Sequence, residues 1–251
     1  MGYTLNIGII GAGNIGGALA RHFVSMGHRV AISNSRGPGS LATFAAERNV
    51  LPVSVKDVVR DKHLVVIAIP EDGVLALPQD LFAGAAGGTI VVDAGNYYPG
   101  VRDVQITEID GGMPESEWVA QRLDIPILKA FNSITVWSLA TRGLPSGTPG
   151  RIALPVAGDD SRDKEVLLSL LHQMGFDGFD AGTLAESWRQ QPGTPAYCMD
   201  LDIAGLIAAL GKAEYSRIDQ YRANALAGAK QAVDAMGSLA AAMAAAGKPA
   251  E

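Results

Sequence analysis

Cysteine is almost absent from this 251-residue chain, which contains Cys198 alone. A single cysteine excludes a disulfide framework within the chain and is typical of a protein in a reducing compartment, so we expect a cytoplasmic protein. Long apolar runs are lacking too, because none approaches the roughly eighteen residues that a membrane-spanning helix needs. The opening residues, MGYTLNIGII, have no basic segment before the first apolar run and do not match a signal peptide.

Basic charge is also in short supply. Twenty lysines and arginines stand against 26 aspartates and glutamates, which gives a net charge of −6. Because such a chain offers no basic stripe for nucleic acid or for an anionic membrane, we expect a small molecule as its partner. The four histidines are scattered and lack the spacing of metal ligands, so we expect no metal site.

Short apolar segments of strand length alternate with segments of helical periodicity through the first half of the chain. Continuous apolar strands are typical of a parallel sheet that is covered on both faces, and their alternation with helices indicates βαβ units. The sequence therefore predicts an α/β fold with a Rossmann-type, doubly wound and mainly parallel sheet. The expected strands span residues 4–10, 28–33, 51–55, 63–70, 87–96 and 125–132, and the expected helices include 14–26, 39–49 and 54–60.

The segment ATRGLPSGTPGR (140–151) is rich in glycine, proline and hydroxyl residues, which is typical of a linker or an exposed loop. We therefore predict an NADP-binding domain over residues 1–150 and a smaller C-terminal α/β region with long terminal helices over residues 151–251. The last helix is alanine-rich, and its narrow apolar stripe predicts a homodimer because small residues allow close helix approach. The stripe consists of Leu226, Val233, Met236, Leu239 and Met243.

A glycine-rich turn, GAGNIG (11–16), lies between the first predicted strand and the first predicted helix. In a dinucleotide-binding turn the first glycine permits a tight bend, the second lets the backbone approach a pyrophosphate, and the third lets the helix pack against the strand. The free amides of the helix N-terminus then face the phosphates. The candidate contacts are Gly11, Gly13, Asn14, Ile15 and Gly16.

The end of the second predicted strand reads ISNSRGPGS and contains no carboxylate between Val30 and Ser40. NAD-binding chains place an acid there for the ribose 2′-hydroxyl, whereas an arginine accommodates the 2′-phosphate of NADP. A guanidinium offers a permanently charged planar fork, and the neighbouring side chains offer neutral donors. The sequence therefore predicts NADP(H), bound by Ser33, Asn34, Ser35 and Arg36.

Ligands of such sheets bind beyond the carboxyl ends of the strands. The fourth strand ends at Ala68, Ile69 and Pro70, the fifth ends near Asn96, and the sixth is followed by Asn132 and Ser133. We expect these residues to face the nicotinamide half, with Asn132 and Ser133 acting by positioning only. Lys129 is the one base of the sixth-strand motif, and we place it at the surface or at the edge of the core.

In this order and spacing the motifs resemble the coenzyme F-420-dependent NADP oxidoreductase family and the related cytosolic reductase domain of the STEAP metalloreductases. The resemblance covers residues 5–197 and rests on GAGNIGGALARHFVSMGHRV, the Ser-Arg pair, VVDAGN, KAFNSITVWSL, VAGDD and MGFDGFDAGTLAESW. It implies that NADPH binds across the sheet, with Ser35 and Arg36 at the 2′-phosphate. The segment from Asn132 to Ile134 would then form the wall against which the nicotinamide lies. Archaeal members carry a histidine where Asn132 stands, and the KAFN form resembles the STEAP-type domain, which uses a flavin.

The resemblance implies hydride exchange between NADPH and a second cofactor, which is either coenzyme F-420 or a flavin (FMN or FAD). Two alternatives stay open: NADPH-dependent reduction of an imine or carbonyl compound, and a non-catalytic NADPH-binding module. Reduction of a carbonyl needs a proton donor near the nicotinamide, and Lys129 and Tyr97 are the titratable candidates there. The segment ESWRQQPGTPAY (186–197) allows two interpretations. It either covers the flat ring system of a bound cofactor, or its tryptophan fills the core and the rest connects to the last helices. We assign Glu71 and Asp200 to the first turns of helices.

Overall fold

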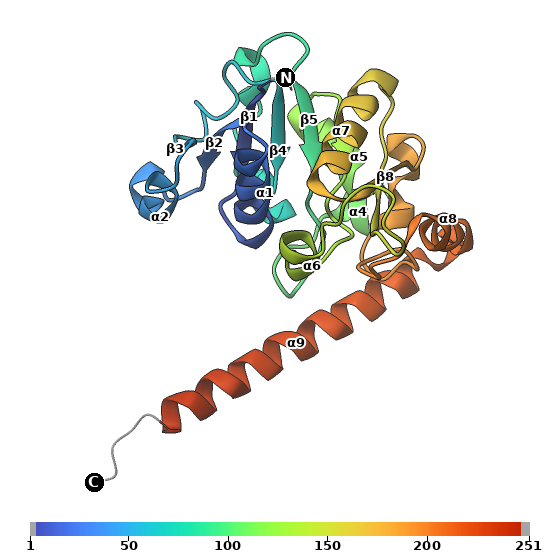
Figure 1. Cartoon of the computed structure of the whole chain (residues 1–251). Helices are drawn as coiled ribbons and strands as arrows, with labels where there is room; N and C mark the ends of the chain where they lie inside the picture. Colours follow the sequence, from blue (N-terminus) through green and yellow to red (C-terminus); the bar gives the residue numbers. More distant parts are fainter. Residues whose placement is uncertain (1–3, 247–251) are drawn as a thin grey trace.

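The structure, a computed structural model, describes residues 4–246, with side chains as far as residue 235. Six parallel strands form the main sheet in the order β3-β2-β1-β4-β5-β6 (Figure 1). This order, with β1 and β4 side by side at the centre, is that of a doubly wound Rossmann sheet, and it confirms the predicted fold class. The strands are β1 (Asn6–Ile10), β2 (Arg29–Ser33), β3 (Val50–Pro52), β4 (Leu64–Ile67), β5 (Ile90–Asp93) and β6 (Leu128–Lys129).

The core lies on both faces of this sheet because successive side chains of a strand point in opposite directions. In β1, Ile7 and Ile9 enter one apolar cluster while Ile10 enters the other. In β4, Val66 and Ile67 divide in the same way. With both faces buried, the strands contain valine and isoleucine in unbroken runs, as the sequence predicts.

The remaining elements of the first half cover the two faces and connect the strands. They are α1 (Asn14–Ser25), η1 (Pro38–Ser40), α2 (Ala42–Ala45), α3 (Glu71–Leu75), η2 (Leu81–Gly84), α4 (Thr107–Asp110), α5 (Glu115–Leu123) and α6 (Val136–Thr141). Leu19 and Phe23 of α1 pack on one face, and Trp118 and Val119 of α5 pack on the other. The carboxyl ends of all six strands meet at one edge, where α1 begins.

The C-terminal region adds a second, two-stranded parallel sheet of β7 (Ala153–Val156) and β8 (Asp177–Asp180), connected by α7 (Ser161–Met174). A bridge joins it to the main sheet, because Lys129 and Ala157 exchange backbone bonds with N···O distances of 2.8 and 3.0 Å. After it come η3 (Leu184–Gln190), α8 (Ile203–Lys212), η4 (Tyr215–Arg217) and α9 (Ile218–Ala246). The division of the chain at residue 150 stays a prediction. Within residues 4–246, no helix is both long and apolar enough to cross a membrane.

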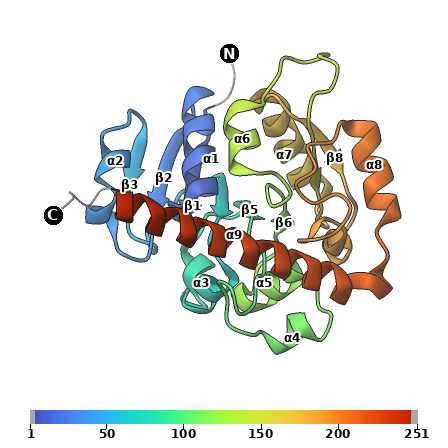
Figure 2. The same ribbon diagram turned by 90° about the horizontal axis from the view of Figure 1, so that it is seen from below.

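The last helix, α9, extends beneath the carboxyl edge of the main sheet from the side of α8 toward the side of α2 (Figures 1 and 2). Only its beginning is packed: Ile218 and Tyr221 are buried, whereas Val233 is 51% exposed. Of the predicted apolar stripe, Met236, Leu239 and Met243 lie outside the described side chains.

Three predicted elements are shorter than expected. Residues 54–60 form turns and no helix, although Ser54 and Asp57 form a capping pair with Ser54 Oγ 2.6 Å from Asp57 Oδ2. The turns end at Asp61, whose φ of 53° lies outside the helical region. The helix predicted over 39–49 reduces to α2, because Pro38–Ser40 form a separate 3₁₀ turn. The sixth strand pairs only over Leu128–Lys129.

Candidate functional site

The glycine-rich turn connects β1 to α1 as the motif predicts. Gly11 has a φ of 110°, and a Cβ there would collide with the carbonyl oxygen of Ala68. A Cβ at Gly16 would collide with the carbonyl oxygen of Gly11, so only glycine lets α1 approach the strand. A Cβ at Gly13, in contrast, would meet no protein atom within 4 Å. Gly13 is therefore the position of the turn that is open to a ligand.

A pocket of about 890 Å³ lies at this edge of the sheet. It brings together the glycine turn (Gly11, Gly13), the end of β2 (Asn34–Arg36) and the end of β4 (Ala68–Pro70), three of the segments that the sequence predicts. Asn14, the first residue of α1, is exposed beside Gly13 and lines a neighbouring hollow. Residues far apart in the chain thus form one continuous surface at the carboxyl edge, which is the place where such sheets bind nucleotides.

The loop after β2 is shaped by Asn34. Its side-chain oxygen accepts the backbone N–H of Arg36 at 3.1 Å and the hydroxyl of Ser40 at 3.2 Å. These bonds close a local turn that leaves Ser35 and Arg36 exposed at the pocket. Asn34 is therefore used in orienting the loop.

Eight predicted residues do not line this pocket: Asn14, Ile15, Gly16, Ser33, Asn96, Asn132, Ser133 and Ile134. Ser33 is fully buried, and its hydroxyl points to the carbonyl oxygen of Ile9 at 3.5 Å, so we leave it out of the proposed contacts. Ile134 belongs to the apolar core, and Gly16 and Ile15 pack between α1 and the sheet. These residues support the site from behind.

Two segments of the pocket escaped the sequence analysis. Ser54, Val55 and Lys56 follow β3 and lie beside the end of β2, because Val53 donates its N–H to Ile32 O at 2.9 Å. The opposite wall is apolar and runs from α3 to Pro78. The sheet topology could have predicted the segment after β3. Because β3 is parallel to β2 and pairs with it, its carboxyl end reaches the same edge of the sheet.

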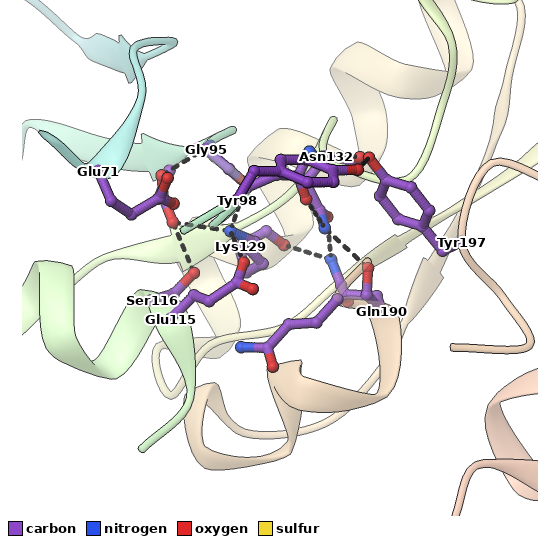
Figure 3. Close-up of polar contacts among 12 residues, drawn as sticks. Glu71, Gly95, Tyr98, Glu115, Ser116, Lys129, Asn132, Gln190 and Tyr197 are labelled. Atoms are coloured by element: carbon purple, nitrogen blue, oxygen red, sulfur yellow. Dashed lines mark hydrogen bonds and ion pairs between the residues drawn. The ribbon is translucent and has the colours of Figure 1, made fainter. Parts of the chain in front are cut away.

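At the ends of β5 and β6, three side-chain amides form a hydrogen-bonded network (Figure 3). Asn132 Nδ2 donates to Asn96 Oδ1 at 3.1 Å and to Gln190 O at 2.7 Å, and Asn132 Oδ1 accepts from Gln190 Nε2 at 2.9 Å. Asn96 returns a bond of 3.0 Å to Asn132 O. Asn132 is 2% exposed, so its polar atoms serve the protein itself. The network holds the loops after β5 and β6 against η3.

Ser133 continues this wall, since it is buried and its carbonyl oxygen accepts the N–H of Cys198 at 3.0 Å. Beside it, the hydroxyls of Tyr98 and Tyr197 lie 2.9 Å apart (Figure 3). Burial raises the pKa of both phenols. Either hydroxyl can be the donor in this bond.

Lys129, which the sequence places at the surface or the core edge, is instead completely buried. Its ammonium lies 2.9 Å from Asp93 Oδ2 and 2.7 Å from Gly95 O (Figure 3). The same carboxylate accepts the Ser116 hydroxyl at 2.6 Å and the Gly95 N–H at 2.8 Å, and Glu115 Oε2 lies 3.9 Å from the ammonium. The sequence did contain a signal for this burial, because Lys129 stands at the end of an apolar strand. A charge buried there requires a partner of opposite charge.

Glu71 lies in the first turn of α3, as predicted, yet it too is completely buried and neither carboxyl oxygen has a hydrogen-bond partner. We call Glu71, Asp93, Glu115 and Lys129 the buried charge cluster. Burial, helped by the neighbouring carboxylates, raises the pKa of Glu71 well above its usual range, and burial raises that of Glu115 to about 7. Burial lowers the pKa of Lys129, but the carboxylates outweigh it and the net shift is upward. The ammonium therefore stays charged.

The segment 186–197 is buried or half-buried throughout. Trp188 packs edge-on against Tyr215 with ring centroids 5.2 Å apart, and Arg189 bonds to Ala181 O at 2.7 Å. Asp200 does not lie in a helix turn, since α8 begins at Ile203 and Asp200 Oδ2 accepts the Ser138 hydroxyl at 2.6 Å. Among the side chains of residues 4–235, no group of three or more histidines, cysteines or carboxylates has the arrangement of a metal site.

Residues 6–97 match the model of a protein family described as coenzyme F-420-dependent NADP oxidoreductase. A hypothetical protein from Sinorhizobium meliloti has a crystal structure that is 32% identical, with a TM-score of 0.63, over 78% of this chain and 94% of that chain. A crystal structure from Arthrobacter sp. FB24, described provisionally as an F-420-dependent NADP reductase, is 22% identical over 73% of this chain and 87% of that one, with a TM-score of 0.54. At that identity the likeness shows the fold alone.

Among curated proteins, the protein YjhV of Escherichia coli is 47% identical over 66 residues. The match covers 26% of this chain and 48% of YjhV. The chain therefore spans about half the length of this curated relative.

Proposed function

Since the chain belongs to the family of coenzyme F-420-dependent NADP oxidoreductases, we propose that it exchanges a hydride between NADPH and the flat ring of a deazaflavin or flavin. The observation that carries the proposal is the pocket at the carboxyl edge. It joins an open glycine turn to Arg36, and no aspartate or glutamate lines it. The second cofactor, coenzyme F-420 or FMN/FAD, is the part of the proposal that the family does not fix.

The pocket fits a dinucleotide phosphate. Gly13 leaves room for the pyrophosphate, and the first amides of α1 face it with the positive end of the helix dipole. Ser35 and Arg36 would hold the 2′-phosphate, and Ile69 and Pro70 would lead to the nicotinamide. Bound NADPH supplies the hydride, while the protein places the ring.

The nicotinamide wall supports catalysis by positioning. The amide network of Asn96, Asn132 and Gln190 is neutral, and both polar atoms of the Asn132 amide are engaged within it, so it fixes the shape of the wall and donates no proton. Hydride transfer to a flavin or deazaflavin ring needs mainly that two rings are held face to face with water excluded. The reduced ring can then take its proton from solvent.

The tyrosine pair favours the second candidate, reduction of an imine or carbonyl compound. Such a reaction needs a proton donor beside the hydride path. Tyr97 does not suit this role, because its hydroxyl is held by Asp110 Oδ1 at 3.1 Å and by the N–H of Ile106 at 2.7 Å. Tyr98 suits it better, because Tyr197 can stabilise the phenolate through their shared hydrogen bond.

Rapid mixing of the NADPH-loaded full chain with acceptors separates the candidates. We expect NADPH to be oxidised by coenzyme F-420, FMN or FAD, at a rate that Tyr98→Phe changes by no more than a few fold. If a cyclic imine or a ketone is the acceptor instead, Tyr98→Phe should lower the rate by about 10²- to 10⁴-fold. Tight NADPH binding without oxidation by any acceptor would contradict both candidates and support a non-catalytic binding module.

We also propose a homodimer through α9. The helix leaves the body after Tyr221, and the described side chains from there to residue 235 are exposed or half-buried. A helix with so little packing along this part has little stability of its own. Light scattering should show a dimer for the full chain and a monomer for a chain that ends after Lys230, which keeps the buried Ile218 and Tyr221. A monomeric full chain would contradict the proposal.

A further inference from the structure

We propose that Lys56 is a second cation for the 2′-phosphate and therefore helps to select NADP over NAD. The proposal rests on the proposed function and extends it to a residue outside the glycine turn and the end of β2. It assigns the ligand class of this end of the pocket as a 2′-phosphorylated adenosine.

The topology places Lys56 beside Arg36. Strands β2 and β3 are parallel neighbours, with Ile32 opposite Pro52, so the chain leaves both strands at the same edge. The loops that follow, Asn34–Arg36 and Ser54–Lys56, line the same pocket. Two cationic side chains, Arg36 and Lys56, therefore line one pocket from loops that follow different strands.

The charge balance of the pocket is unlike that of the chain. The chain carries a net charge of −6, whereas among the residues that the structure describes the pocket is lined by two cations and by no aspartate or glutamate. The carboxylate next to Lys56 in sequence, Asp57, is engaged with the Ser54 hydroxyl at 2.6 Å and with Arg60 at 3.2 Å. No ion pair holds Lys56 within the described part of the chain. Its charge is therefore available to a ligand.

A phosphate monoester has close to two negative charges near neutral pH. One guanidinium balances about one of them through its planar fork, and an ammonium on a flexible stem adds a point charge that adapts to the remaining oxygen. Val55, Ala76 and Leu77 line the same pocket and give it apolar surface, which suits the flat faces of an adenine. The chemistry of this corner thus matches the adenosine end of NADP.

The test is calorimetric titration of the full chain with 2′,5′-ADP, 5′-AMP, NADP⁺ and NAD⁺. Lys56→Gln should weaken 2′,5′-ADP and NADP⁺ by about three- to tenfold at low salt and leave 5′-AMP and NAD⁺ unchanged. The matched control is Lys212→Gln, the same change at the exposed end of α8, which should alter none of the four ligands. The effect of Lys56→Gln should shrink at about 0.5 M salt because an exposed charge is screened.

Each other outcome overturns the proposal in a recognisable way. Equal losses for 2′,5′-ADP and 5′-AMP would place Lys56 at a group that both nucleotides share. Unchanged affinities would make it a solvated surface lysine. If the unaltered chain binds neither NADP⁺ nor 2′,5′-ADP, the proposed cofactor itself is wrong, and the role of Lys56 falls with it.

Discussion

Replacing Lys129 with methionine is expected to lower the free energy of unfolding by about 3–5 kcal/mol, because a buried carboxylate then loses its partner. Asp93 would keep the Ser116 hydroxyl and the Gly95 N–H but no positive charge. The Gly95 carbonyl oxygen would also lose its donor. Urea unfolding of the two proteins measures the difference, and Lys212→Met is the exposed control.

The loss should depend on pH in a defined direction. The folded-state pKa of Glu115, about 7, lies above its usual value of 4.5, so folding binds a proton between these values and stability falls as the pH rises through that window. Lys129 lowers the pKa of Glu71 and of Glu115, so its removal raises both pKa values further, and Lys129→Met should be less stable at pH 8 than at pH 5. A variant that stays within about 1 kcal/mol of the parent at pH 8 would contradict the cluster as described.

This result also bears on catalysis. The ammonium of Lys129 points into the protein at Asp93 and Gly95, so it has no free path to a substrate. Lower activity of Lys129→Met would report a loosened fold, and unfolding must be measured beside the rate. Tyr98 is therefore the residue at which a role as proton donor should be tested.

Replacing Arg36 with alanine is expected to weaken NADPH binding by about 10- to 150-fold, which corresponds to a charge-assisted contact of about 1.5–3 kcal/mol. NADH has no 2′-phosphate, so its affinity should barely change. Calorimetric titration with both nucleotides measures the selectivity directly. Because Arg36 is exposed and its side chain forms no internal ion pair in the described structure, the substitution should leave the fold intact.

The control for Arg36 is Arg48→Ala, an exposed arginine of the same half of the sheet that does not line the pocket. It should change neither affinity. Equal losses for NADPH and NADH after Arg36→Ala would show that the guanidinium binds a group common to both, such as the pyrophosphate, and would refute the assignment.

The fold was predictable because its signals are local. A buried parallel sheet requires unbroken apolar strands, and the glycine turn needs Gly11 for its positive φ and Gly16 for the approach of the helix. The failed helix over 54–60 shows the limit of such signals. Ser54 and Asp57 form a capping pair there, but a cap stabilises one turn and cannot decide whether the following residues continue as a helix.

The interior of the site was less predictable because its partners are distant in sequence. The pair of Tyr98 and Tyr197 joins residues 99 positions apart, and Lys129 meets Asp93 across 36. Taken singly in the sequence, each of these residues is indistinguishable from an ordinary loop residue or a charged surface residue. Asn132 has the same difficulty: its position was predicted, but the bonds that satisfy its amide come from Asn96 and Gln190, which only the folded chain brings together.

The bonds across the carboxyl edge have a consequence for the release of the oxidised nucleotide. The bridge of Lys129 and Ala157, the amides of Asn132 and Gln190, and the Cys198–Ser133 bond fasten the two parts of the chain at the nicotinamide end. A hinge that widened this end would break all of them together. We therefore expect the nucleotide to leave from its adenosine end, past the exposed loop of Ser35 and Arg36, so that product release depends on the grip of that loop.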